Sequence, residues 1–310
     1  MTEAIISGYD GTGRKSAGWW PSRYGAEDSA GTGNELTPER VLRALRIPVS
    51  GRVVELAQTV EPGIAVAEPR TWALHILSYA ALAGSGFVPG EGTSDATAFD
   101  EQAELSFHVG CHVDGLGHVG IAGRFYNGTR YEDFYSPTGH RRFGMEGVRS
   151  WMTRGVCLDV AGLIEKEIIE EGFVIGPDHL DGACHRQGID IGAGDVVLLH
   201  TGWGSLWSND AKRYGANEPG LGWEGAHWLT ARRVSAVGAD NWALEVIPFE
   251  RAEHALVVHQ HLLAETGTYI IENLRTSELV REDRSEFLFA MSPLKIRGST
   301  ASMVSPVAVL

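Results

Sequence analysis

Cysteine is scarce in this sequence: Cys111, Cys157 and Cys184 are the three cysteines among 310 residues. A small and odd number does not suit a disulfide framework, and it indicates free thiols in a reducing compartment. The opening segment MTEAIISGYDGTG has no charged region followed by an apolar block, so we expect no secretory signal. These features predict a cytoplasmic protein.

Runs of basic residues and long apolar runs are also lacking. The formal net charge is -14, and Lys and Arg are not clustered, which argues against a nucleic-acid partner. The longest apolar stretches, such as 196–199 and 301–310, fall well short of the roughly 20 residues that cross a bilayer. We therefore expect neither nucleic acid nor a membrane as a partner.

The rest of the composition is that of an ordered globular protein. Hydrophobic residues make up 43% and charged residues 21% of the chain, and its 39 glycines indicate many turns. Short apolar runs alternate with helical patterns. Strands are expected at 52–56, 105–109, 156–160, 196–200, 236–239, 268–272 and 286–291, and helices at 178–187, 223–233 and 251–265. This alternation predicts one α/β domain over residues 1–310, with a central mixed or barrel-like sheet flanked by helices.

The N-terminal segment, residues 1–36, shows neither helical nor strand periodicity. It is rich in Gly, Ser and Asp and carries Trp19, Trp20 and Tyr24, so we expect an arm that packs through its aromatic side chains. Packing of such an arm on a neighbouring subunit predicts a homo-oligomer, a homodimer or homotetramer.

A helix is predicted directly after this arm. Thr37 suits the N-cap and Pro38 the first helical position, while Val41, Leu42 and Leu45 form the expected apolar stripe. The helix should end before Pro48.

The segment 108–118, HVGCHVDGLGH, concentrates polar donors. His108, His112, Asp114 and His118 share a face of an extended chain, whereas a helix would rotate Asp114 away from His108. Full extension would, however, separate His108 from His112 by roughly 13 Å. We therefore expect a bend at Gly110, and a turn at Gly115 and Gly117 that returns His118 to the group.

Convergence of these donors predicts a metal site. Imidazole nitrogens and carboxylate oxygens suit zinc, manganese or iron. The alternative is a polar loop whose histidines bond only backbone and water. Cys111 is out of phase with the donors and should be a buried thiol rather than a nucleophile.

HVGCHVDGLGH resembles the metal signature of the cyclase family of metal-dependent hydrolases, usually H-x-G-T-H-x-D-x-P-x-H, which includes bacterial kynurenine formamidase and isatin hydrolase. Every ligand position is kept, but Cys111 replaces Thr and Leu116 replaces Pro. The resemblance extends to 23–45, 194–203, 237–246 and 257–274, the last reading VVHQHLLAETGTYIIENL. It implies the swivelling β/α fold of that family.

The block 257–274 supplies two further candidates. The family places a histidine before a Leu-Leu pair and a glutamate before Asn-Leu, and His259 and Glu272 match these positions. His261 competes for the histidine role. We prefer His259 because it stands three residues before Leu262.

The resemblance implies hydrolysis of a C–N bond next to a carbonyl, in an aryl formamide, a lactam or a cyclic imide. His108, His112 and Asp114 would hold a divalent metal, zinc or manganese, and His118 would act as general base and acid. His259 and Glu272 would either complete a second metal site, with His118 as a further ligand, or orient the water. The sequence leaves one ion or two open.

The expected substrate is a small aromatic or cyclic amide. Tryptophans in glycine-rich stretches (Trp19, Trp20, Trp203, Trp207 and Trp223) would either wall a flat substrate or belong to the core or a subunit contact.

Two other functions remain open at this point. His112 and Asp114 also fit the start of a two-histidine, one-carboxylate iron oxygenase triad, which would require a jelly-roll of short strands. The chain could also be a metal-binding homologue without activity, although a retained His118 argues against that function.

Overall fold

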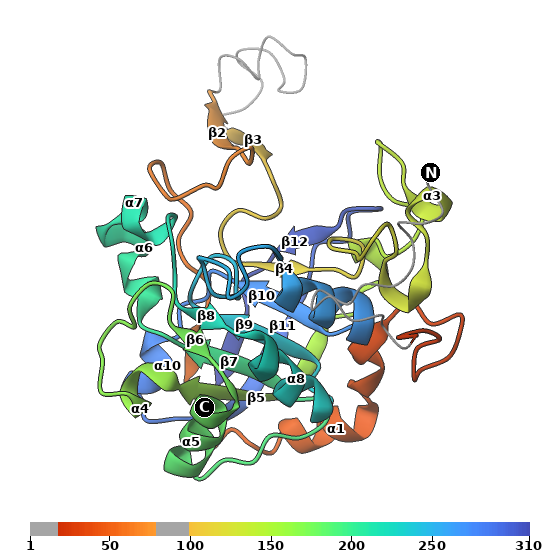
Figure 1. Cartoon of the computed structure of the whole chain (residues 1–310). Coiled ribbons are helices and arrows are strands. Elements are labelled where there is room, and N and C mark those ends of the chain that lie inside the picture. The colour runs from red at the N-terminus through yellow and green to blue at the C-terminus, as the bar shows by residue number, and fades with distance from the viewer. Residues whose placement is uncertain (1–17, 79–98) are drawn as a thin grey trace, which may run out of the picture.

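The computed structural model describes residues 18–78 and 99–310. Nine strands of this part form one curled mixed sheet in the order β1-β13-β11-β5-β7-β9-β10-β4-β12 (Figure 1). Their bounds are β1 Val53–Glu55, β4 His112–Asp114, β5 Trp151–Asp159, β7 Val196–His200, β9 Ala236–Ala239, β10 Tyr269–Glu272, β11 Glu286–Met291, β12 Ala301–Met303 and β13 Val307–Val309. The predicted mixed α/β domain with helices flanking a central sheet is confirmed.

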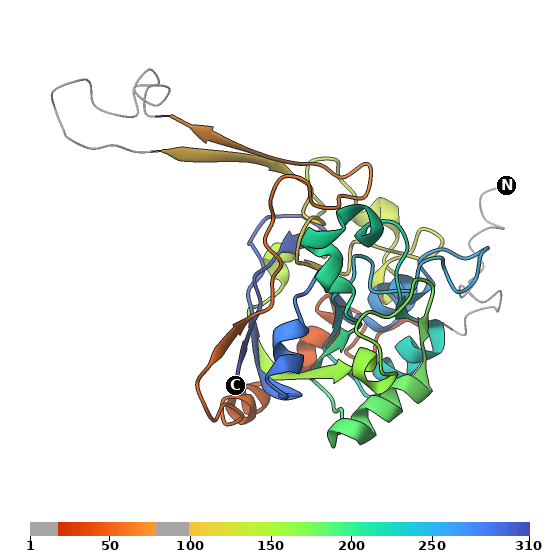
Figure 2. The same ribbon diagram turned by 90° about the vertical axis from the view of Figure 1, so that its left-hand side faces the viewer.

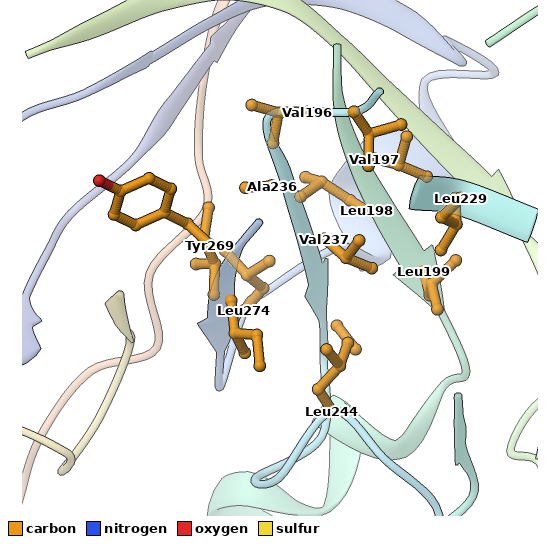
Figure 3. Close-up of a cluster of buried hydrophobic side chains, with 14 of the residues drawn as sticks. Val196, Val197, Leu198, Leu199, Leu229, Ala236, Val237, Leu244, Tyr269 and Leu274 are labelled. Carbon is orange, nitrogen blue, oxygen red and sulfur yellow. The ribbon is translucent and has the colours of Figure 1, made fainter. Parts of the chain in front are cut away.

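The centre of the sheet is parallel. β5, β7, β9 and β10 run in the same direction, and antiparallel strands extend the sheet on both sides. All five residues of β7 and all four of β9 are buried, as expected for strands covered on both faces. Their apolar side chains pack with Leu229 and Tyr269 (Figure 3).

Helices cover the sheet. Their bounds are α1 Pro38–Ala44, α3 Tyr131–Phe134, α4 Val160–Leu163, α5 Pro177–Gln187, α6 Leu206–Asn209, α7 Ala211–Tyr214, α8 Trp223–Ala231, α9 Val257–His259 and α10 Ser277–Arg281. Short 3₁₀ turns occupy η2 Gly31–Glu35, η3 Tyr126–Gly128, η4 Met145–Gly147 and η5 Trp203–Ser205. Within the described ranges, no helix has the length and hydrophobicity of a bilayer span.

Most predicted elements agree with the structure. The strands predicted at 196–200, 236–239 and 286–291 have those bounds, and α5 begins one residue earlier than predicted because Pro177 takes its first position. The helix predicted at 251–265 begins only at Val257, after Leu256 in a left-handed conformation, and continues as a π-helical segment, η6 Gln260–Thr266.

The strand predicted at 105–109 is wrong. β3 ends at Leu105, and the Val109 N–H donates to the Ser106 carbonyl in a turn. β3, Asp100–Leu105, instead pairs with β2, Trp72–Leu77. Figures 1 and 2 show this pair projecting away from the sheet, directly before the segment with His108. A smaller pair joins β6 Val174–Ile175 to β8 Gly220–Leu221.

Helix α1 has the predicted cap but not the predicted buried stripe. The Thr37 side chain accepts a hydrogen bond from the Arg40 N–H, and Pro38 is the first helical residue. Leu42 and Leu45, however, are 60% and 49% exposed, and Ala44 is the residue that is buried. Ala44 therefore faces the core, whereas Leu42 and Leu45 face outwards.

The described part of the N-terminal arm, residues 18–36, packs on its own chain. Arg124 lies over the Trp20 ring at 5.0 Å, and Tyr126 donates to Asp28. Farther along the arm, the buried Glu35 pairs with Arg233. Residues 1–17 of the predicted arm lie outside the described part of the chain.

Candidate metal centre

The centre is built on two adjacent strands. β4 pairs antiparallel with β10, which places Glu272 directly opposite His112. His112 and Asp114 are two residues apart on β4, so both side chains lie on the same face of the sheet. All three residues are buried.

Bends on both sides of β4 bring in the outer histidines. Gly110 has a φ of +66°, a value that favours glycine, and this confirms the predicted bend. The His118 N–H donates to the Gly115 carbonyl at 3.0 Å, which closes the predicted turn. As a result, the rings of His108 and His118 lie 4.1 Å apart.

Asp114 stands at the middle of the cluster. Its Oδ1 lies 2.9 Å from His108 Nδ1 and 3.5 Å from His112 Nε2. Its Oδ2 lies 4.0 Å from His118 Nε2 and 3.9 Å from His259 Nε2. One carboxylate thus faces four imidazole rings.

Glu272 joins the inner part of the cluster. Its Oε2 lies 3.0 Å from His112 Nε2, and its Oε1 lies 3.2 Å from His259 Nε2. The structure therefore brings together all six side chains proposed from the sequence: His108, His112, Asp114, His118, His259 and Glu272.

The donor atoms fit a cation. His108 Nδ1, His112 Nε2 and both Asp114 carboxylate oxygens are buried and lie close to other polar atoms, yet none of them has the geometry of a hydrogen bond, although a buried polar atom normally makes one. Two sets of donors each lie within 4.8 Å of one another, and Asp114 belongs to both: His108, Asp114 and His118, and His112, Asp114 and Glu272. Nitrogen and carboxylate donors so arranged suit a divalent transition metal, and the shared aspartate leaves room for one ion or two.

Backbone contacts fix the orientation of His112. Its Nδ1 lies 2.8 Å from the Gly110 carbonyl, which can only accept, so Nδ1 carries the hydrogen. Asn273 donates to the same carbonyl at 3.0 Å. His112 Nε2 is therefore directed at the cluster, as expected for a metal ligand held by an outer hydrogen bond.

Glu245 orients His259 and was not identified from the sequence. Its Oε1 lies 2.5 Å from His259 Nδ1, and its carboxylate also accepts from the backbone N–H groups of Val258 and His259. Glu245 lies in the family-like block 237–246, but no sequence spacing connects it to His259. The contact arises because the residues after β9 return against the start of α9.

His261 points away from the cluster. Its Nε2 lies 2.8 Å from the Thr230 hydroxyl and its Nδ1 lies 2.7 Å from Glu265. Of the two competing histidines, His259 is the one that the structure places beside Asp114 and Glu272.

Electrostatics separate the histidines into two kinds. Burial, with a smaller contribution from the neighbouring His108 and His259, outweighs the attraction of Asp114 and lowers the pKa of His118 to about 3, so this ring is neutral at pH 7. Burial also disfavours the charged forms of His112 and His259, but interaction with the negatively charged carboxylates beside them outweighs burial and raises the pKa of both. The nearby histidines hold the pKa of Asp114 well below its usual range despite its burial.

The two positions that depart from the family signature are both buried. Cys111 is 2% exposed, and burial raises the pKa of its thiol, which disfavours a thiolate nucleophile. Leu116 belongs to the same hydrophobic core. Trp203 and Trp207 are also fully buried, in a separate apolar cluster with Tyr214, and do not form walls of an open site.

Comparisons with known proteins show the family and the fold of this chain. The model of the cyclase family, described as "Putative cyclase", matches residues 54–246. No match was found among curated proteins. A crystal structure described as a novel cyclase is 28% identical, with a TM-score of 0.83 over 93% of this chain and 96% of that chain.

Isatin hydrolases share the fold at lower identity. Isatin hydrolase A from Labrenzia aggregata, bound to benzyl benzoate, is 20% identical, with a TM-score of 0.60 over 83% of this chain and 93% of that chain. Isatin hydrolase A from Ralstonia solanacearum is 21% identical, with a TM-score of 0.57 over 83% of this chain and 91% of that chain. With the family model matching more than half of its length, the chain belongs to the cyclase family.

Proposed function

We propose that this protein is a metal-dependent hydrolase that cleaves a carbonyl C–N bond in an aryl formamide, a lactam or a cyclic imide with metal-activated water. The observation that carries the proposal is the set of unpartnered donor atoms around Asp114. Membership of the cyclase family supports it, as do the structural neighbours described as isatin hydrolases and as a potential metal-dependent hydrolase with cyclase activity.

His108, His112 and Asp114 are the proposed ligands of the primary ion, zinc or manganese. Such an ion would polarise the substrate carbonyl and lower the pKa of its bound water from about 16 towards 7. The chain contributes these ligands as a buried carboxylate and oriented imidazoles, which are already in place before substrate arrives.

His118 is the proposed acid and base. Its side chain is 23% exposed and is the most accessible of the cluster, so it lies at the edge that substrate reaches first. An imidazole at this edge has a ring nitrogen that can accept a proton from the attacking water. Delivery of that proton to the leaving nitrogen would complete the cleavage.

His259 and Glu272 are the proposed inner groups. With His118 they would either bind a second ion or orient the water and the His118 ring. Glu245 supports the first alternative, because a buried carboxylate on the far nitrogen of a histidine is the usual outer partner of a metal ligand.

A cytoplasmic homodimer or homotetramer is also proposed. The three cysteines are free thiols, which suits a reducing compartment. The outward-facing Leu42 of α1 and Leu45, directly after its end, offer apolar surface to a second copy of the chain.

The fold argues against the iron oxygenase hypothesis. It required a jelly-roll of short antiparallel strands, whereas the centre of this sheet is parallel and flanked by helices. In addition, His108 and His118 lie close to the same aspartate, so the cluster offers more ligands than the two histidines and one carboxylate of that triad.

Metal reconstitution tests the proposal. The metal-depleted protein would be assayed with aryl formamides, lactams, cyclic imides and lactones after adding zinc, manganese or iron. We expect hydrolysis of at least one C–N substrate only with metal. Metal binding without hydrolysis of any panel member would instead favour a homologue without activity, and oxygen consumption with ferrous iron and an oxo-acid would favour the oxygenase.

A further inference from the structure

A small cavity lies beside the metal centre and shares His108 with it. Its wall is formed by 65–67, Arg70, Val109, Gly110, Gly215, Trp242 and Asn273. The wall also adjoins the inner ligands, because Gly110 and Asn273 hold His112 in place. A chemical group in this cavity would therefore lie next to His108, whose Nδ1 is 2.9 Å from Asp114.

Trp242, one of the residues that line this cavity, has a hydrogen-bond donor without a partner. Its indole Nε1 is buried and has no partner. By contrast, the buried indole of Trp203 donates to the Tyr214 carbonyl at 3.2 Å, and that of Trp207 donates to the Thr59 carbonyl at 2.8 Å. Since a buried N–H normally has an acceptor, the Trp242 indole is suited to an acceptor that arrives with a ligand.

Arg70 adds a positive charge to the same wall. One of its N–H groups donates to the His108 carbonyl at 3.1 Å, which holds the guanidinium beside the centre. Within residues 18–78 and 99–310, no carboxylate oxygen lies within 4.0 Å of the Arg70 guanidinium nitrogens, and none of the cavity's described lining residues is acidic. The guanidinium therefore keeps donors available, and its fork matches the two oxygens of a carboxylate.

We propose that this cavity binds a carboxylate of the substrate, with Arg70 and the Trp242 indole as donors. The inference rests on the proposed function and narrows its substrate class to amides that carry a carboxylate near the scissile carbonyl. The cavity is too small for a whole aromatic substrate, so it receives the acidic group while the amide lies at His108 and His118. Arg70 and Trp242 are thus specificity-determining residues.

Binding of benzoate to the full-length, zinc-loaded protein tests this inference without turnover. The indole signal of Trp242 is identified in ¹H–¹⁵N spectra of ¹⁵N-tryptophan-labelled protein as the one missing in Trp242→Phe. We expect benzoate to shift this signal and benzamide, which is neutral, to leave it in place. Arg70→Gln should weaken benzoate binding roughly 10- to 100-fold, as expected for loss of a charged hydrogen bond, and Arg70→Lys should recover part of it.

Arg232→Gln is the matched control, because this arginine stacks on Trp228 of α8 and does not line the cavity. It should bind benzoate like the parent protein. Equal shifts with benzoate and benzamide, an unmoved signal, or unchanged affinity in Arg70→Gln would overturn the inference. Failure of the proposed function would appear separately, as absence of metal-dependent hydrolysis in a protein that still binds benzoate.

Discussion

Glu272 lies opposite His112 across the β4–β10 pair, and its Oε2 approaches the Nε2 of that histidine to 3.0 Å. The register of two neighbouring strands therefore determines the inner part of the centre. A shift by one residue would move Glu272 to the other face of the sheet. The centre consequently depends on the same strand pairing that forms the core.

Removing the charge of Glu245 should weaken metal binding. Its carboxylate holds His259 Nδ1 at 2.5 Å, and loss of such an outer partner typically costs about 10- to 100-fold in metal affinity. Glu245→Gln should therefore show this loss in a chelator competition. Glu265→Gln is the matched control, because Glu265 holds His261 at 2.7 Å away from the centre, and an equal loss there would contradict the assignment.

His118→Ala should separate metal binding from catalysis. This ring is the accessible edge of the centre, and loss of a general acid and base typically slows a reaction about 10²- to 10⁴-fold. The variant should retain at least one metal equivalent by elemental analysis and lose turnover. His112→Ala should lose the metal itself, and turnover at the parent rate in His118→Ala would show that another group moves the proton.

Metal affinity should continue to rise with pH beyond the pH range in which an ordinary histidine loses its proton. Neighbouring carboxylates raise the pKa of His112 and His259 in the metal-free protein, so these rings keep their protons until the pH passes the raised values. A metal must displace those protons, and its affinity is lost as the pH falls through them. Calorimetry in buffers of different ionisation enthalpy should record proton release on zinc binding between about pH 6 and pH 8. Zinc binding without proton release there would contradict this coupling.

Glu35 should stabilise the docked arm in a pH-dependent way. Burial alone would raise its pKa, but hydrogen bonds from Tyr24 and Arg233 outweigh burial and lower it. Because the folded pKa is depressed, the stabilisation is present above the unfolded pKa and is lost as the pH falls through the folded value. Glu35→Gln should lower the free energy of unfolding by about 1–3 kcal/mol at pH 7, and by less near pH 3.

Denaturant titrations at both pH values measure this difference. The control is Glu132→Gln, since Glu132 pairs with Arg130 in an exposed ion pair. That variant should unfold like the parent protein at both pH values. An equal cost for Glu35→Gln at pH 7 and pH 3 would mean that the ion pair does not supply the stability.

Periodicity predicted the parallel core well because its strands are continuously apolar. β7 reads VVLLH and every residue is buried, so composition alone marks it as a covered strand. The segment 105–109, LSFHV, instead alternates apolar and polar residues, and after Leu105, the last residue of β3, it is a turn. There the left-handed Gly110 and the pairing of β3 with β2 outweigh local strand propensity.

The sequence predicted the part of the candidate centre whose ligands lie close together in the chain. Spacing alone joined His108, His112, Asp114 and His118, whereas His259 and Glu272 required the family resemblance. Glu245 could not be found, because its contact with His259 depends on how two distant loops meet. The outward direction of Leu42 and Leu45 was missed for a similar reason, since helical periodicity does not state which side of a helix meets the core.

The location of a bound metal tests the central claim most directly. Crystals of the metal-loaded protein, measured by anomalous diffraction at the zinc or manganese edge, should show a peak within coordination distance of Asp114, His112 Nε2 and the His108 ring. The same crystals of Asp114→Asn should lose the peak or most of its occupancy. A structure without an ion at Asp114 under saturating metal, or with the ion bound elsewhere while the side chains around Asp114 stay unliganded, would contradict the account.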